Sequence, residues 1–411
     1  MTQYQVRAVR CDHRSSDKEV YQALKRATAP LERAWAKLEA AKTITIKFNQ
    51  AWRPSELVFL EGQLQELVDY SVARALLRLL RERTTAEISC CEIATMAHRD
   101  PNLDTPQTIT LMDLLDEFDV RFVDGNLPPH KVYQVPGGGH MFHQYLLPES
   151  VVDTDAFISV QKLKSHKFMG VTLALKNLFG LCPMEPHGRS RGYFHHLLRL
   201  PYVLVDLGRL IDPTLNIIDG LVGQSEREWG GDGRICDILV AGDQVIATDA
   251  CATHLMGLDP LGDWPNQPFV RDRNSIRLAH LVGFGSADLA DPDAIDFQSE
   301  VEAPVGVFHT EETDPFELVA AWRKTTCEQA LYYRDHASWF HERYAGQYIL
   351  LQDNEVRWAD EASNLSVSRR ELAGTRTSSA MWFKYVDPDE AEGEHYEVYE
   401  QNLQALQEMG I

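Results

Sequence analysis

The stretch ISVQKLKSHKFMGVTLALKNLFG, residues 158–180, decides how the rest of the chain is interpreted. Its first residues are β-branched and apolar, which predicts a buried strand, and a segment with Lys162, Lys164 and His166 follows directly. After Gly170, an apolar segment that contains Lys176 predicts the start of a helix. A strand, a basic segment and a helix in this order indicate a βα unit whose polar residues stand where the strand ends.

Strands and helices alternate along most of the chain. Segments rich in Ile, Val and Phe predict strands over residues 43–48, 87–93, 120–124, 156–160, 215–219 and 236–241. Helical periodicity is found over residues 17–41, 63–83, 108–118, 191–210, 244–257 and 274–282. The alternation predicts an α/β fold with a doubly wound, mostly parallel sheet. Because ligands bind beyond the carboxyl ends of parallel strands, residues that follow the strands are the candidates for a site.

The tail has a different pattern. Residues 287–304 are acidic and irregular, which is typical of a linker or a peripheral loop, and residues 313–333 look helical. Residues 344–358 predict two strands around a turn at Asp353 and Asn354. We therefore expect an α/β core domain over residues 1–290, a linker and helical segment over 291–340, and a small C-terminal α+β module over 341–411.

Composition excludes several classes of function. The net charge of −21 opposes nonspecific binding to nucleic acids and to anionic membranes. No apolar run approaches the roughly 18 residues that span a bilayer, and the N-terminus has no signal-like apolar segment, so we expect a cytoplasmic protein. The seven cysteines are scattered without a C-x-x-C pair, so no iron–sulfur cluster is expected. Motifs for nucleotide binding and for a nucleophilic serine are absent as well.

A basic pocket in so acidic a chain predicts an anionic ligand. Most of the candidate residues lie at the ends of predicted strands or inside the apolar run LALKNLFG, where a lysine must find an anionic partner or lose its proton; Arg234 belongs to the glycine-rich turn WGGDGR. The alternative for each isolated lysine is a solvated surface position. The predicted substrate-binding residues are Lys47, Asn49, Lys162, Lys164, Asn177 and Arg234.

The predicted catalytic residues are His166, Lys176 and Asp219. Neighbouring lysines should lower the pKa of His166 and leave a neutral imidazole that serves as a base or a metal ligand. Of the adjacent His195 and His196 only one can face the site, and His196 is preferred. A divalent metal held by His166, His196 and Asp219 is the one cofactor that the sequence leaves open.

Longer motifs add a resemblance to a known family. The segments VQKLKSHKFMGVTLALKNLFGL, VDLGRLIDPTLNIIDGLVG, WGGDGR and ILVAGDQVIATDACATHLMGLDP resemble the family called domain of unknown function 362. Many members carry ferredoxin-type cysteine modules, and this chain departs from them in having none. A more distant similarity links the chain to nickel-pincer lactate racemases, which also present a histidine and a lysine ten residues apart, as His166 and Lys176 are here, with another histidine downstream.

Two classes of function follow. The first is an enzyme that acts on a small carboxylated or phosphorylated metabolite by proton transfer or elimination, as an isomerase, racemase or lyase, in a cleft lined by lysine and histidine. The second is a non-catalytic accessory protein that handles a metal or a redox partner; the cluster modules of the relatives suggest it, and the missing cysteines oppose it. The sequence identifies neither the substrate nor the oligomeric state.

Overall fold

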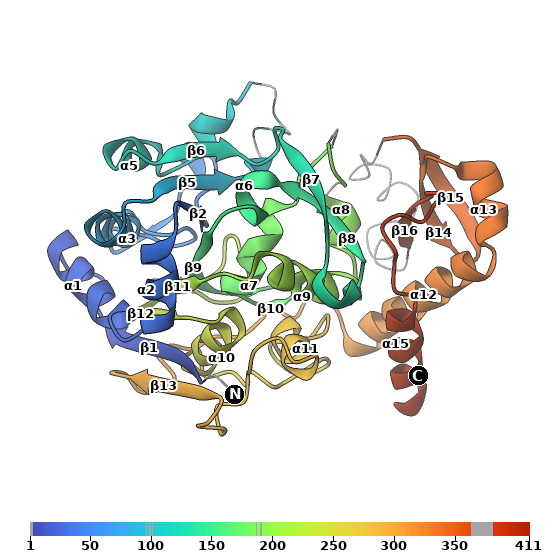
Figure 1. Ribbon diagram of the computed structural model, residues 1–411. Helices are drawn as coiled ribbons and strands as arrows, with labels where there is room; N and C mark the ends of the chain where they lie inside the picture. Colours follow the sequence, from blue (N-terminus) through green and yellow to red (C-terminus); the bar gives the residue numbers. More distant parts are fainter. Residues whose placement is uncertain are drawn as a thin grey trace.

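A nine-stranded sheet forms the centre of the molecule (Figure 1). The computed structural model describes residues 3–95, 97, 100, 102–185, 187–189, 191–362 and 381–411. The strand order is β13-β1-β12-β11-β9-β2-β5-β6, and β10 pairs with β9. Neighbours are parallel from β11 to β6, whereas β12 is antiparallel to both β1 and β11. The predicted α/β fold with a mostly parallel sheet is therefore confirmed.

The bounds of the sheet strands are β1 Tyr4–Arg10, β2 Thr43–Phe48, β5 Glu87–Glu92, β6 Arg121–Asp124, β9 Ala156–His166, β10 Gly170–Thr172, β11 Leu215–Gln224, β12 Gly233–Gly242 and β13 Ile295–Ser299. Two small hairpins pair β3 (Phe59–Leu60) with β4 (Gln63–Leu64) and β7 (His130–Gln134) with β8 (Gln144–Pro148). The helices of the same part of the chain are α1 Asp17–Thr28, α2 Glu32–Ala40, α3 Tyr70–Arg83, α5 Met112–Glu117, α6 Glu149–Val152, α7 Ala174–Asn177, α8 Arg191–Phe194, α9 Leu200–Ile211, α10 Val245–Leu255 and α11 Ser275–Leu281.

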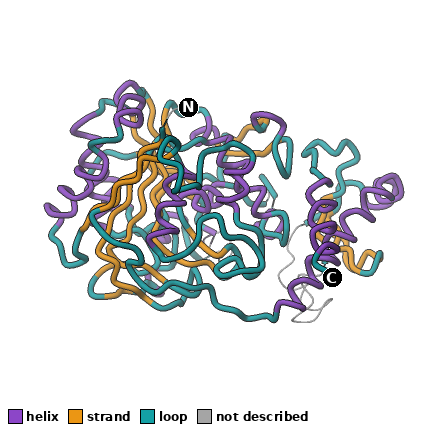
Figure 2. Tube along the Cα trace, turned by 90° about the horizontal axis from the view of Figure 1, so that it is seen from below, coloured by secondary structure: helices purple, strands orange, loops and turns teal. Residues whose placement is uncertain are grey.

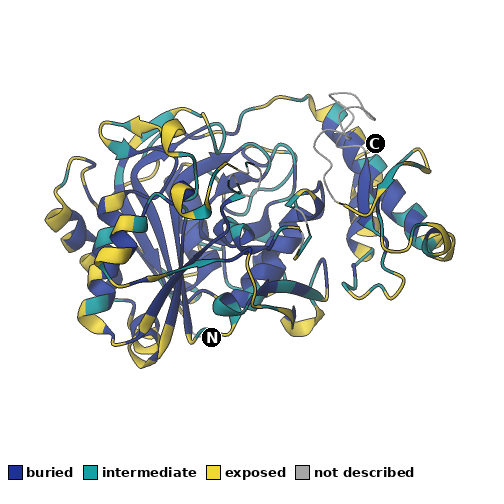
Figure 3. Cartoon of the chain, turned by 90° about the horizontal axis from the view of Figure 1, so that it is seen from above, coloured by how far each residue is buried: buried dark blue, intermediate teal, exposed yellow. Residues whose placement is uncertain are grey.

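Helices cover both faces of the sheet (Figure 2). On one face, α1, α2 and α3 bury their apolar side chains against inward residues such as Ile44, Ile158 and Ile217. On the other face, α7, α9, α10 and α11 pack with residues such as Phe157 and Ile218. The side chains of adjacent strand residues thus point into the two hydrophobic cores on opposite faces of the sheet. This explains why the strands are apolar along their whole length. Figure 3 shows these strands as the buried interior of the molecule.

Several predicted element boundaries were wrong for identifiable reasons. The strand predicted to end at residue 160 continues to His166, because its lysines have partners inside the protein. The helix predicted over residues 17–41 is two helices, α1 and α2, separated by Pro30, which lacks the backbone N–H that a helix interior needs. The helix predicted over residues 191–210 is likewise divided into α8 and α9.

The tail forms a second, smaller α+β unit. Its elements are α12 Phe316–Asp335, α13 Ala337–Tyr344, β14 Tyr348–Gln352, β15 Glu355–Asp360, β16 Trp382–Tyr385 and α15 Glu397–Glu408. The predicted pair of strands is confirmed as β14 and β15, with Asp353 and Asn354 in the left-handed conformation between them. Residues 287–304, predicted to be a linker or loop, include β13, which pairs with β1 at the edge of the main sheet. The domain limits at residues 290 and 340 stay a prediction.

A buried ion network joins the tail to the main sheet's helices. Arg199, just before α9, lies 2.8 Å from Glu394, and both side chains are fully buried. Lys384 of β16 binds the other oxygen of Glu394 at 3.0 Å. One carboxylate therefore compensates two buried cations from different parts of the chain.

Within the described residues, no helix combines the length and the apolarity that crossing a bilayer requires.

We expect Glu394→Ala to destabilise the protein strongly, because it leaves the cations of Arg199 and Lys384 buried without their shared carboxylate. The free energy of unfolding should fall by about 3–5 kcal/mol, the cost of stranding a buried charge. Denaturant unfolding measures this. Arg78→Ala is the control: it removes an exposed ion pair with Glu82 on one helix and should leave the unfolding midpoint unchanged. Equal midpoints for the two variants would contradict the network's importance.

Candidate functional site

A cavity of about 530 Å³ opens beyond the carboxyl ends of β2, β5 and β9. This volume is in the range of small-molecule sites. Its lining includes Lys47, Asn49, Trp52, Glu92, Gln161, Lys164, His166, Thr172, Lys176, Asn177, Phe179, Arg191, His195, Glu228 and Trp229. Segments distant in the sequence converge here because parallel strands end at the same edge of the sheet. Six predicted site residues thus line one cavity: Lys47, Asn49, Lys164, His166, Lys176 and Asn177. Their roles stay predictions.

Three other predicted residues lie elsewhere. Lys162 and Asp219 form an ion pair of 2.8 Å with both side chains fully buried, and neither lines the cavity. Asp219 also accepts hydrogen bonds from the backbone N–H of Asp69 and of Leu221, so its oxygens are occupied within the fold. Arg234 donates to the carbonyl oxygens of Gly233 and Val307 outside the cavity. Asp219 is therefore a structural partner rather than the predicted catalytic carboxylate.

The predicted metal ligands do not form a site. Asp219 is paired with Lys162, and the ring nitrogens of His196 lie 3.1 and 2.9 Å from the carbonyl oxygens of Leu197 and Met381. The Nδ1 atom of His166 accepts hydrogen bonds from two backbone N–H groups, so its lone pair is not available to a metal. These three residues therefore offer no shared coordination sphere for a divalent metal.

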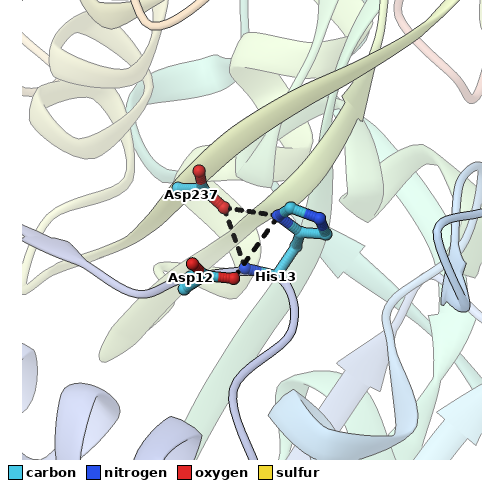
Figure 4. Close-up of side chains that lie close together, drawn as sticks. All are labelled: Asp12, His13 and Asp237. Carbon is cyan, nitrogen blue, oxygen red and sulfur yellow. Dashed lines mark hydrogen bonds and ion pairs between the residues drawn. The ribbon is translucent and has the colours of Figure 1, made fainter.

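One group among the described residues does bring three ligand atoms within 4.8 Å, namely Asp12, His13 and Asp237 (Figure 4). The Oδ1 atom of Asp237 accepts from both the ring Nδ1 and the backbone N–H of His13, at 2.7 and 2.8 Å. Asp12 accepts from the backbone N–H of Arg14. The group is thus held by its own hydrogen bonds, and it does not line the cavity.

The lysines of the cavity differ in what they bind. Lys47 pairs with Glu92 at 2.6 Å. Lys164 donates to the carbonyl oxygens of Glu66 and Glu228, at 2.8 and 3.3 Å, and its Nζ lies 4.4 Å from the centre of a Trp229 ring. Burial lowers the pKa of Lys164 to about 7, against the opposing effect of the Glu66 and Glu228 carboxylates.

Lys176 is the lysine of the cavity without a counterion. Its Nζ lies 4.6 Å from the centre of the Phe179 ring and makes no hydrogen bond or ion pair with a described residue. Burial lowers the pKa of Lys176 to about 8; Glu228 opposes this shift and the cation of Arg191 adds to it. An anionic ligand would supply the charge that Lys176 lacks.

His166 is fixed in one tautomer. Its Nδ1 atom accepts hydrogen bonds from the backbone N–H groups of Phe168 and Met169, at 2.9 and 3.0 Å, so the ring proton is on Nε2. The Nε2 atom faces Glu228 Oε1 at 3.7 Å. Burial lowers the pKa of His166 to about 3, and Lys176 and Lys164 contribute. The imidazole is neutral, as predicted, but its lone pair is occupied, so the predicted role as base or metal ligand does not fit this geometry.

His195 has the free ring nitrogen that His166 lacks. It lines the cavity with its ring centre 5.9 Å from that of His166 and 4.8 Å from that of Phe168. Burial lowers the pKa of His195 well below 6.5, and no hydrogen bond joins its ring to another described residue. The preference for His196 was wrong because α8 ends at Phe194, and the turn that follows resets which side chains face the cavity.

The backbone N–H groups at the start of α7 already have a hydrogen-bond acceptor within the protein. Free backbone N–H groups at the start of a helix can attract an anion. Here, Asp249 of α10 accepts from the N–H groups of Ala174 and Leu175, at 2.9 and 2.8 Å. Burial raises the pKa of Asp249 to about 7. Asp249 therefore caps the helix and packs, and anion binding in the cavity depends on side chains.

Two parts of the cavity were not predicted from the sequence. Glu228 and Trp229 come from the loop between β11 and β12, and Trp52 from the loop after β2. The two indoles are stacked, with ring centres 4.0 Å apart and planes 12° from parallel. The available signal was that Trp229 is the first residue of WGGDGR, that Glu228 precedes it, and that Trp52 follows the end of a strand.

Comparison with known proteins assigns the chain to a family. Residues 45–254, half of the chain, match the family described as "Domain of unknown function (DUF362)", and the chain belongs to this family. The thylakoid-associated protein sll1697 of Synechocystis sp. is 32% identical over 125 residues. That match covers 29% of this chain and 38% of the relative, so the chain spans about two fifths of the relative's length.

A solved structure with some similarity is the lactate racemase apoprotein from Thermoanaerobacterium thermosaccharolyticum. The superposition has a TM-score of 0.37 at 16% sequence identity, and it covers 62% of this chain and 57% of that chain.

Replacing different buried lysines should have opposite effects on stability. Lys162→Met leaves Asp219 without its cation inside the sheet, so the free energy of unfolding should fall by about 3–5 kcal/mol. Lys176→Met removes an ammonium that has no counterion among the described residues, so stability should stay the same or rise. Denaturant unfolding without added anions compares the two variants. A loss in Lys176→Met as large as in Lys162→Met would show that Lys176 is paired for structure.

Proposed function

We propose that this member of the DUF362 family is an enzyme that moves a proton on a small carboxylated or phosphorylated metabolite, in the manner of an isomerase, racemase or lyase. One observation carries the proposal: two side chains that have no hydrogen-bond or ion-pair partner in another described residue, Lys176 and the ring of His195, line the same cavity. The first supports anion binding and the second supports proton abstraction.

Charge favours an anionic ligand in the cavity. Lys176 and Arg191 lie against the same ring, that of Phe179, with Lys176 Nζ at 4.6 Å and the guanidinium carbon of Arg191 at 6.0 Å from its centre. The chain as a whole carries −21, so two neighbouring cations are a local reversal of sign. Such a reversal inside a partly enclosed cavity concentrates the field and favours an incoming anion.

Proton transfer would proceed at a carbon close to the anionic group. His195 is unprotonated at neutral pH, because its pKa is well below 6.5, and it can therefore accept a proton from carbon. The negative charge that develops on the substrate would be stabilised by Lys176 and Arg191. The Nε2–H of His166, held in direction by the backbone, would donate a hydrogen bond to the ligand.

The alternative, an accessory protein that carries a metal, has less support in the cavity. It requires His166, His196 and Asp219 as ligands, and each of these has its donor atoms engaged within the protein. A stoichiometric divalent metal in the purified protein, lost on mutation of His166, would favour that alternative over the proposal.

Anion affinity should depend on pH through Lys176. The pKa of Lys176 is lowered to about 8, and an anion binds its ammonium form, so affinity should be full below pH 8 and should fall as the pH rises above it. Affinity should also fall with added salt. Calorimetric titration with malonate and with phosphate tests both expectations.

Lys176→Met should lose about 1.5–3 kcal/mol of anion binding free energy, typical of hydrogen bonds to charged groups. The matched control is Lys167→Met, which removes a lysine that faces Glu311 at 3.8 Å and does not line the cavity. Equal affinities for wild type and Lys176→Met would remove Lys176 from the anion site.

Exchange of a carbon-bound proton should depend on His195. Small 2-oxo, 2-hydroxy and amino acids are incubated with the protein in D₂O, and loss of the C–H signal is followed by NMR. For the compound that exchanges, His195→Asn should slow exchange by roughly 10²–10⁴-fold, the usual contribution of a general base. His254→Asn, at an exposed histidine of α10, should exchange at the wild-type rate. Undiminished exchange in His195→Asn would refute the assigned base.

A further inference from the structure

We infer that Lys176 forms an imine with its substrate, and that the substrate class is therefore small 2-oxo acids, in which a ketone carbonyl stands next to the carboxylate. The inference rests on the proposed function and specifies its substrate. It assigns to Lys176 a covalent role in addition to charge compensation.

The contacts of the buried lysines single out Lys176 as the nucleophile. Lys47 is held by Glu92, and Lys162 by Asp219, in ion pairs of 2.6 and 2.8 Å. Lys164 donates to two backbone carbonyl oxygens. Imine formation at Lys47 or Lys162 would break an ion pair, and an imine at Lys164 would keep at most one N–H for its two hydrogen bonds. Lys176 alone among these four has neither a carboxylate nor a carbonyl on its Nζ within the described residues.

The surroundings of Lys176 favour its unprotonated form. Its side chain packs against Phe179 in the cavity, and the fixed cation of Arg191 lies against the same ring. A lysine that is desolvated and close to a second cation is the form in which lysine acts as a nucleophile. A pKa of about 8 instead of 10.5 raises the unprotonated fraction at pH 7 roughly 300-fold.

The same geometry accounts for the substrate class. A carboxylate placed against the guanidinium of Arg191 would bring a directly bonded carbonyl group toward Lys176, because both cations lie at one aromatic ring. A monofunctional anion such as phosphate would satisfy the charge but leave the amine unused. The aromatic and apolar lining, with Phe179 and Trp229, suits a short carbon chain.

The chemical step is balanced without an oxidant or a reductant. The Nζ lone pair attacks the carbonyl carbon, and the C=O π pair moves to oxygen. The carbinolamine then loses its oxygen as water together with the two N–H protons of the amine, and a C=N bond replaces the C=O bond. Protonation of the imine nitrogen withdraws electrons from the former carbonyl carbon. The C–H bonds on the next carbon, on the side away from the carboxylate, become acidic, and His195 can take a proton from there.

Reductive trapping tests the inference. The protein is incubated with pyruvate and sodium cyanoborohydride, and the adduct is located by intact mass and peptide mapping. We expect one adduct per chain, on Lys176, formed at least about tenfold faster than on the exposed Lys18 because of the larger unprotonated fraction. Malonate should slow its formation by competition for the same cations.

Lys176→Arg is the decisive variant, because it keeps the cation and cannot form an imine. It should bind malonate with near wild-type affinity and show no rapid adduct. Lys167→Met is the control variant at a lysine that does not line the cavity, and its adduct on Lys176 should persist. Trapping spread over surface lysines, or equally rapid in Lys176→Arg, would overturn the inference.

The outcomes separate this inference from the proposed function. If malonate binds and a C–H proton exchanges but no adduct forms on Lys176, the imine is refuted and the proton-transfer proposal stands. If malonate does not bind and no proton exchanges, the proposed function is refuted and the imine with it.

Discussion

The ion pair between Lys162 and Asp219 is the constraint on which the site depends. The two residues stand opposite each other on the parallel strands β9 and β11, at the centre of the sheet and with no exposed surface. The Asp219 carboxylate also accepts a hydrogen bond from the backbone N–H of Asp69, and the carboxylate of Asp69 in turn caps the N-terminus of α3. A single carboxylate thus ties the two central strands to a helix. It allows β9 to continue as a strand past a lysine, which carries Lys164 and His166 to the edge of the cavity.

The arrangement shows how a protein of this charge keeps several lysines inside. Each buried ammonium must be compensated, and the chain uses carboxylates for Lys47 and Lys162 and carbonyl dipoles with an aromatic ring for Lys164. These contacts are complete within the protein. Lys176 is left with a ring face and the nearby cation of Arg191; the Glu228 carboxylate acts on its pKa but does not bond its Nζ, and a cavity opens beside it. Functional interest therefore falls on the lysine whose ammonium has no hydrogen-bond acceptor or ion-pair partner among the described residues.

Sequence patterns located the strand ends and the residues that stand on them, because apolar runs and the rule for parallel sheets depend on local order alone. Lys47, Asn49, Lys164, His166, Lys176 and Asn177 were found in this way. The roles of Asp219, Asp249 and the two histidines depend on contacts between distant segments. Asp249 caps a helix some 75 positions before it, and His166 loses its lone pair to the turn between β9 and β10. No periodicity shows such pairings. The choice between His195 and His196 required the point at which α8 ends.

The stacked rings of Trp52 and Trp229 give the cavity an intrinsic optical label. Two indoles with ring centres 4.0 Å apart and nearly parallel planes couple their electronic transitions, and the coupling depends steeply on their separation. One ring comes from the loop after β2 and the other from the loop between β11 and β12, so any relative displacement of these loops alters the near-ultraviolet circular dichroism. Six other tryptophans contribute to the total absorbance, but the coupled signal belongs to this pair. The arrival of a ligand at the cavity is thus observable without a dye or a chemical tag.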